Sequence, residues 1–275
     1  MNRFWHLAFC VLFLSICLQP VVIAQEKYNS PSVVNPSQFL SFKKSKGLYP
    51  TYKAPRAVIF CYSRVFKDYV LNNSNVEKCD GIFSKLYFLK DTNHEVAIMG
   101  DFGIGAPATA YKMEQLIAWG VKEFLIVGTA GGLQKDLKIG DIILCNKAIR
   151  GEGTSSYYLP PSQFVHATSK LTSKIEKTLQ KKKLSYRKGT SWTCDAIFRE
   201  TEQELQQFQK EGVLCVEMEA SAAFAVASFR DVEASAIFAI SDSLHDLQWR
   251  PDFYSTKTEE SLKKLYHVAV ETLQG

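Results

Sequence analysis

Residues 107–132 read PATAYKMEQLIAWGVKEFLIVGTAGG and place a helix, a strand and a glycine-rich turn in direct succession. Apolar side chains recur at helical spacing between Pro107 and Trp119, and a proline suits the first turn of a helix. The apolar run 123–127 is typical of a buried strand, and it leads directly into Gly128-Thr129-Ala130-Gly131-Gly132. This stretch therefore predicts a strand that is buried beneath a helix and ends in a turn with little side-chain bulk.

The alternation of apolar strands and amphipathic helices continues on both sides of this stretch. We expect strands at 57–61, 84–89, 95–100, 139–148, 214–217 and 233–240, and further helices at 168–181, 220–229 and 258–273. The runs 84–89 and 95–100 look like a hairpin. Strands that are separated by helical segments indicate an α/β fold with three layers, in which helices flank a mixed, mostly parallel sheet.

The first residues have the pattern of an export signal. Arg3 is the only charged residue before position 26, an apolar run follows from Phe4 to Leu18, and Ala24 ends a stretch of small and apolar residues. This order predicts a signal peptide over 1–24 and an exported protein, periplasmic or secreted. The apolar run is short for a bilayer span, so an uncleaved membrane anchor is the less favoured interpretation.

The remaining chain reads as one domain with an N-terminal extension. Residues 25–55 are rich in Pro, Ser, Asn and Lys and predict an arm or linker, whereas 56–275 carries the alternating pattern. Hydrophobic residues make up 46% of the 275 residues and the formal net charge is +5, which is ordinary for a globular protein and too mild for nucleic-acid binding. The cysteines show neither metal-ligand spacing nor a disulfide framework, so we expect no metal site.

Two acidic motifs interrupt apolar segments. Val216-Glu217-Met218-Glu219-Ala220 lies between a predicted strand and a predicted helix, where buried carboxylates are costly unless they are paired. One acid could cap the helix, which explains one glutamate better than two. Ser241-Asp242 follows the apolar strand that ends at Ile240. Capping of a turn accounts for this pair as well as a functional role does.

Two glycine-containing turns could hold an anion. Gly103-Ile104-Gly105 opens the helix that begins near Pro107, and Gly128 to Gly132 follows a buried strand. Backbone N–H groups in such turns can cradle an anion, although tight packing alone explains a single turn.

Taken together, the motifs resemble the nucleoside phosphorylase and nucleosidase superfamily in order and spacing. The resemblance covers roughly residues 56–272 and rests on the following segments: Gly103-Ile104-Gly105, Gly128-Thr129-Ala130-Gly131-Gly132-Leu133, Ile139-Gly140-Asp141-Ile142, Val216-Glu217-Met218-Glu219-Ala220 and Ile240-Ser241-Asp242. Arg150 to Ser155 and the stretch around Asp195 are most similar to the uridine and purine nucleoside phosphorylase branch. The resemblance implies a nucleoside phosphorylase-like fold and phosphorolysis of a nucleoside, purine favoured, to free base and ribose 1-phosphate.

The resemblance also implies roles for individual residues. Glu219 would hold the ribose hydroxyls, Met218 would pack on the sugar, and Asp242 would protonate N7 of the departing purine. Further expected substrate-binding residues are Glu217, Ile197, Phe198 and Ser241, and the expected phosphate-binding residues are Arg64, Gly103, Gly105, Thr129 and Arg150. Phosphate would be a co-substrate with no cofactor, and relatives are commonly homo-oligomers, either dimers or hexamers.

Some positions depart from the phosphorylase pattern. Ile126 stands where phosphorylases usually carry a second phosphate-binding arginine, and the pair Gly131-Gly132 is more typical of nucleosidases. Conversely, the place where nucleosidases carry a water-activating acid reads Cys61-Tyr62-Ser63-Arg64, and an arginine there suits a phosphate dianion. Phosphorolysis is therefore favoured, while a hydrolytic nucleosidase and a non-catalytic nucleoside-binding or storage protein remain open.

Overall fold

The computed structural model describes residues 27–275. The predicted signal peptide, 1–24, lies outside these residues and stays a prediction, as does the predicted homo-oligomer. No helix within the described part is both long and apolar enough to cross a membrane. The helices are α2 (Pro36–Ser45), α3 (Arg64–Asn73), α4 (Ala106–Trp119), α5 (Ser169–Lys181), α6 (Glu202–Lys210), α7 (Ala220–Arg230) and α8 (Thr256–Gln274).

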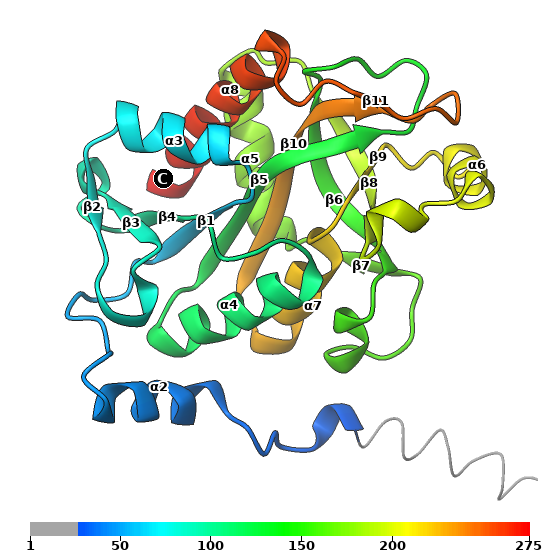
Figure 1. Ribbon diagram of the computed structural model, residues 1–275. Coiled ribbons are helices and arrows are strands. Elements are labelled where there is room, and N and C mark those ends of the chain that lie inside the picture. Colours follow the sequence, from blue (N-terminus) through cyan, green and yellow to red (C-terminus); the bar gives the residue numbers. More distant parts are fainter. Residues whose placement is uncertain (1–26) are drawn as a thin grey trace, which may run out of the picture.

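The strands form one mixed sheet (Figure 1). They are β1 (Ala57–Cys61), β2 (Val76–Lys78), β3 (Leu86–Leu89), β4 (Val96–Met99), β5 (Glu123–Gly132), β6 (Ile142–Gly151), β7 (Phe164–His166), β8 (Arg187–Cys194), β9 (Cys215–Glu217), β10 (Glu233–Ser243) and β11 (Arg250–Pro251). Parallel pairing joins β4, β1, β5 and β10, and separately β6, β8 and β9. Antiparallel pairing joins these two groups and forms the expected β3–β4 hairpin. The mixed sheet is confirmed, and its parallel pairing lies within the two groups.

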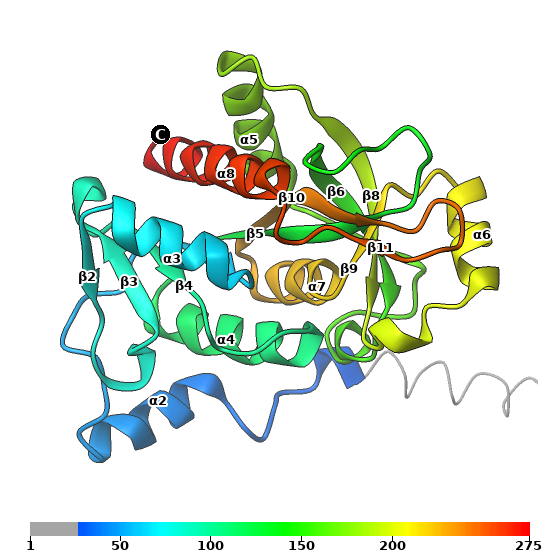
Figure 2. The same ribbon diagram turned by 45° about the horizontal axis from the view of Figure 1, so that its top comes forward.

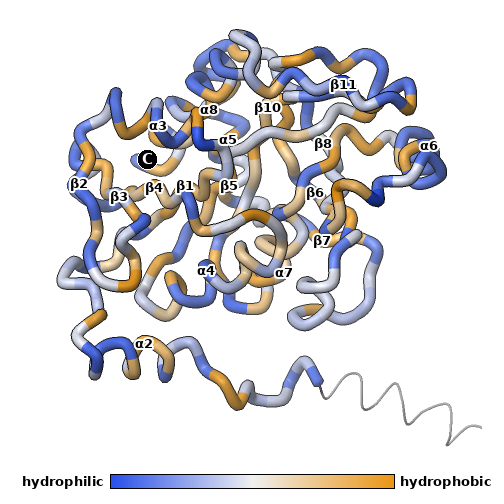
Figure 3. Tube along the Cα trace, viewed as in Figure 1, coloured by the Kyte–Doolittle hydropathy of each residue, from blue (hydrophilic) through white to orange (hydrophobic). Residues whose placement is uncertain are grey.

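Helices cover both faces of the sheet, which confirms the three-layer arrangement (Figure 2). Helices α3, α5 and α8 pack on one face, and α4 and α7 pack on the other. Side chains of strand β1 alternate between the two faces of the sheet. Ile59 faces α3, α5 and α8, whereas Val58 and Phe60 face α4 and α7. All three side chains are fully buried. Apolar residues accordingly concentrate along the central strands (Figure 3).

Part of the predicted N-terminal arm is helical and packed. Helix α2 begins after Asn35, whose side-chain oxygen accepts a hydrogen bond from the Ser37 amide and caps the helix. Leu40 is buried in the same apolar cluster as Met113 of α4. The described portion of the arm therefore adds an outer layer over α4 (Figure 2).

Strand β8 is not evident from hydropathy. Its residues read RKGTSWTC, yet Ser191 and Thr193 are fully buried within the sheet. Their hydroxyl groups have partners inside the protein, described below, and this satisfies them without water. The described cysteines are all free and buried.

Candidate functional site

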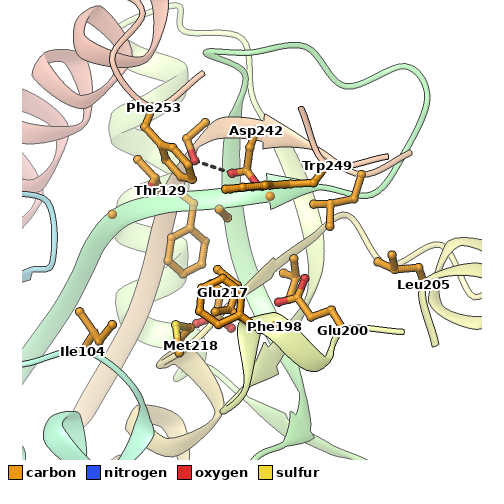
Figure 4. A pocket seen from close by; sticks show the side chains of 18 of the residues that line it. Ile104, Thr129, Phe198, Glu200, Leu205, Glu217, Met218, Asp242, Trp249 and Phe253 are labelled. Atoms are coloured by element: carbon orange, nitrogen blue, oxygen red, sulfur yellow. Dashed lines mark hydrogen bonds between the residues drawn. The ribbon is translucent and has the colours of Figure 1, made fainter. Parts of the chain in front are cut away.

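A cavity of about 440 Å³ opens at the carboxyl ends of β5 and β10 (Figure 4). Its walls come from β5, β9, the end of β10, the loop that follows β10, and the short 3₁₀ helix η4 (Ile197–Arg199). In α/β sheets, ligands bind beyond the carboxyl ends of strands, so the cavity lies where the predicted topology places it. Its volume is sufficient for a small-molecule ligand.

Asp242 reaches this cavity because of an irregularity in β10. The pairing of β10 with β5 shifts register after Ile240, so that Asp242 stands opposite Gly131. Such a bulge redirects the side chains that follow it. The carboxyl of Asp242 accepts hydrogen bonds from the Ser241 hydroxyl at 2.8 Å and from the Trp249 indole N–H at 2.9 Å.

Burial and close packing define the environment of the Asp242 carboxyl. Asp242 is 7% exposed, and burial raises its pKa above the ordinary value, against the two hydrogen bonds, which lower it. A Cβ atom on Gly131 would lie 3.0 Å from Asp242 Oδ2 and 2.5 Å from Leu244 Cδ1. The glycine therefore leaves the space that this carboxyl occupies. A buried carboxyl with a raised pKa suits a general acid.

Glu217 is held entirely by the protein. Oε1 accepts hydrogen bonds from the hydroxyls of Ser191 (3.0 Å) and Thr193 (2.6 Å), and Oε2 accepts from the backbone amides of Glu219 and Ala220, both at 2.7 Å. The last two donors begin helix α7, where unpaired amides favour a negative charge. Both oxygens of this predicted substrate-binding residue are thus engaged by the chain that surrounds them.

Glu219 has a different set of contacts. Oε1 accepts a hydrogen bond from the Gly105 amide at 2.7 Å, and the Met218 backbone amide also acts on the carboxyl. Burial and the neighbouring charge of Glu217 raise the pKa of Glu219 to about 8, and the Gly105 hydrogen bond opposes this shift. Glu219 lines the cavity. Unlike Glu217, which accepts from two hydroxyls and two backbone amides, Glu219 has no side-chain donor among the described residues.

The raised pKa of Glu219 predicts a pH-dependent stability of the unliganded protein. Its folded pKa of about 8 lies above the ordinary 4.5, so the folded state binds the extra proton between these values. The unfolding free energy should fall as pH rises from about 4.5 to about 8. We expect the thermal midpoint to drop less between pH 5 and pH 8 in Glu219→Gln than in the wild type. Equal drops in both proteins would contradict the assignment.

The residues predicted to bind phosphate are only partly brought together. Thr129 lines the cavity, and Arg64 begins α3 two residues after Tyr62, which also lines it. Arg64 is exposed, and its guanidinium has no hydrogen-bond or ion-pair partner within residues 27–275; its charge contributes to lowering the pKa of Asp101, beside the Gly103 turn. These positions leave Arg64 free to meet an anion.

Other predicted phosphate contacts have different partners. The Gly105 amide donates to Glu219, as described above. The Arg150 side chain donates to Ser155 Oγ and to the carbonyls of Leu159 and Pro160, and it does not line the cavity. Ile126 is fully buried between β1 and β10, so no cation comes from that position.

The predicted substrate-binding residues Met218, Ile197, Phe198 and Ser241 line the same cavity. Phe198 lies at the edge of the cavity, and this residue is 91% exposed to solvent. Tyr62 and Glu200 also line the cavity and are not among the predicted site residues. Tyr62 directly follows a predicted strand, so the rule on carboxyl ends could have selected it. Glu200 follows β8, a strand that the hydropathy pattern does not reveal.

A sequence profile described as "Phosphorylase superfamily" matches residues 75–274. The chain belongs to the phosphorylase superfamily. This match spans most of the domain and includes the acidic motifs at 216–220 and 240–242.

Several named relatives are similar to the chain. A DeoD-type purine nucleoside phosphorylase from Clostridium perfringens is 28% identical over 179 residues, which cover 64% of this chain and 74% of that protein. The protein of the same name from Bacillus cereus is 31% identical over 151 residues, covering 54% and 64%. A solved structure described as the P knowlesi homolog of P falciparum PNP has a TM-score of 0.63 at 21% identity, covering 88% and 90%, and it shows the same fold.

Proposed function

We propose that this protein cleaves the N-glycosidic bond of purine nucleosides with inorganic phosphate, releasing the free base and ribose 1-phosphate. The observation that carries the proposal is that one cavity is lined by both Glu219, the N-cap residue of α7, and Asp242, near the end of β10, and that both acids are buried. Membership of the phosphorylase superfamily and the similarity to DeoD-type purine nucleoside phosphorylases support the same chemistry.

The two acids suit opposite ends of a nucleoside. The Glu219 carboxyl accepts hydrogen bonds from the ribose hydroxyls, while the Gly105 amide fixes its position through Oε1. Asp242 protonates N7 of the purine as the electron pair of the breaking bond passes into the base. A phosphate oxygen forms the new bond to the anomeric carbon. Precise placement of these groups and proton donation to the leaving base are the two main sources of acceleration.

Phosphate is favoured over water because of the surroundings of Arg64. Its free guanidinium stands at the N-terminus of α3, where the helix dipole also favours an anion. The turn at Gly103 opens α4 nearby, and Thr129 supplies a hydroxyl at the cavity wall. Because Ile126 brings no second cation, we assign the main phosphate contact to Arg64.

The test is turnover of inosine, adenosine and uridine by the purified protein, with and without inorganic phosphate. We expect purine nucleosides to be consumed only when phosphate is present, with ribose 1-phosphate formed in equal amount to the free base. Release of free ribose without phosphate would make the protein a nucleosidase. The absence of a cation at Ile126 is the observation that favours this alternative. Saturable nucleoside binding with no turnover would make it a binding protein. Either result contradicts the proposal.

A further inference from the structure

The N-terminal arm carries the whole formal net charge of the protein. Residues 27–55 contain five lysines and no acidic residue, whereas the rest of the chain contains 28 basic and 28 acidic residues. Helix α2 of the arm packs on α4 and lies at the periphery of the molecule (Figure 1). The positive charge is therefore fixed at one side of a domain that is otherwise neutral.

The cations of α2 continue onto α4. Lys43 Nζ lies 5.1 Å from the centre of the Phe39 ring, and this ring lies 6.4 Å from the ring of Tyr111 on α4. Burial and then the charges of Lys85 and Lys43 lower the pKa of Lys112, which places these three cations near one another. We call this surface the basic face, and its members are Phe42, Lys43, Lys46, Lys85, Tyr111 and Lys112.

Two aromatic side chains are exposed among these lysines. Phe42 is 54% exposed and Tyr111 is 55% exposed. The Nζ atoms of Lys43 and Lys46 lie 6.0 Å and 5.7 Å from the centre of the Phe42 ring. Exposed rings surrounded by lysines are typical of surfaces that bind a lipid bilayer, because the rings enter the headgroup region while the ammonium groups stay at the phosphates.

The charge of the basic face is not neutralised by the protein. Within residues 27–275, its lysines form no ion pair, and the acids on flanking segments have other partners. Glu114 pairs with Arg230, and Asp101 pairs with Lys67. A second copy of this chain is a poor occupant, because a two-fold contact would place the basic face against itself and bring like charges together. The face therefore complements an anionic surface.

We propose that the basic face docks on a lipid bilayer that contains anionic headgroups and holds the protein at the membrane surface. Phe42 and Tyr111 enter the interface, and the lysines lie among the lipid phosphates. This inference goes beyond the proposed function and does not depend on it. No member of the basic face lines the cavity, so membrane binding and nucleoside turnover can be measured separately.

The test measures binding of the purified full-length protein to vesicles by sedimentation. One set of vesicles contains phosphatidylcholine alone, and the other contains about one-third phosphatidylglycerol. We expect tighter binding to the anionic vesicles, and this preference should weaken as salt rises, because the Debye length falls from about 30 Å at 0.01 M to about 8 Å at 0.15 M. Lys43→Gln/Lys46→Gln should weaken binding to the anionic vesicles by about tenfold or more, since each lysine near an anionic bilayer adds attraction.

Lys177→Gln/Lys264→Gln is the matched control. It removes the same charge from exposed lysines of α5 and α8, which lie on the opposite face of the sheet, and it should leave vesicle binding unchanged. Phe42→Ser should weaken binding at every salt concentration, because the ring contributes through its burial and not through charge. The apolar run at 4–18 is common to all variants, so any binding that it adds cancels in the comparison.

Three results would overturn the proposal. The first is equal binding of the wild type to neutral and anionic vesicles. The second is equal binding of Lys43→Gln/Lys46→Gln and the control variant to anionic vesicles. The third is tighter binding of the wild type to polyuridylate than to anionic vesicles, since the basic face would then serve a nucleic acid. None of these results depends on nucleoside turnover, which tests the proposed function separately.

Discussion

Asp242→Asn should lower kcat for purine nucleosides by about 10²–10⁴-fold, the usual contribution of a positioned general acid. The asparagine keeps the size of the side chain and an oxygen that can accept from the Trp249 indole. It cannot deliver a proton to N7. We therefore expect a loss in kcat with a smaller change in KM, measured by the release of hypoxanthine from inosine at saturating phosphate.

A substrate with a methyl group on N7 provides the matched control. In 7-methylguanosine the base already carries a positive charge, so it departs as a neutral species without protonation. Asp242→Asn should cleave this nucleoside at a rate within about tenfold of the wild type, since the general-acid step is not required. An equal loss on inosine and 7-methylguanosine would show that Asp242 acts through binding or folding, and the leaving-group role would be wrong.

The fold was largely predictable because apolar runs dominate its central strands. The run at 57–61 forms β1 with the predicted bounds, and the buried run from 123 forms β5, although β5 continues through the glycine-rich turn to Gly132. The sequence predicts that the strand ends where these glycines begin. In the structure they pair with β9 and β10, because side chains from Asp242 and Leu244 fill the space above Gly131.

The polar part of the site was harder to predict. Strand β8 carries buried hydroxyls that donate to Glu217, and the hydropathy of the sequence does not show that these hydroxyls are buried. The motif at 216–220 correctly indicated acids that need partners, but it could not show that Glu217 accepts four hydrogen bonds from the protein whereas Glu219 accepts from backbone amides alone. The direction of the Arg150 side chain is likewise set by hydrogen bonds that it donates to carbonyl groups of the loop at 159–160. Such contacts join segments that are distant in the chain, and local spacing does not encode them.

Glu217→Ala should be the most destabilising change among the acids of the site. It removes the acceptor for two hydroxyls and two backbone amides at a residue that is 5% exposed. Leaving several buried donors unpaired costs about 3–5 kcal/mol of unfolding free energy. For a domain of this size, that corresponds to a thermal midpoint lower by about 10 °C. The measurement is thermal unfolding followed by circular dichroism at pH 7.

Glu176→Ala is the matched control for this prediction. Glu176 bonds Lys188 and Tyr186 at a more accessible site, where a lost ion pair typically costs about 1 kcal/mol or less. Both variants replace a glutamate by alanine, so a difference between their thermal midpoints reflects the different burial of the two carboxyls.

Because the Glu219 amide loses its acceptor only in Glu217→Ala, this variant should also lose nucleoside turnover at temperatures where it remains folded. If Glu217→Ala unfolds within about 2 °C of the wild type, then the amides and hydroxyls around it find other acceptors. Glu217 would in that case have to be reassigned from holding the start of α7 to contacting the substrate directly.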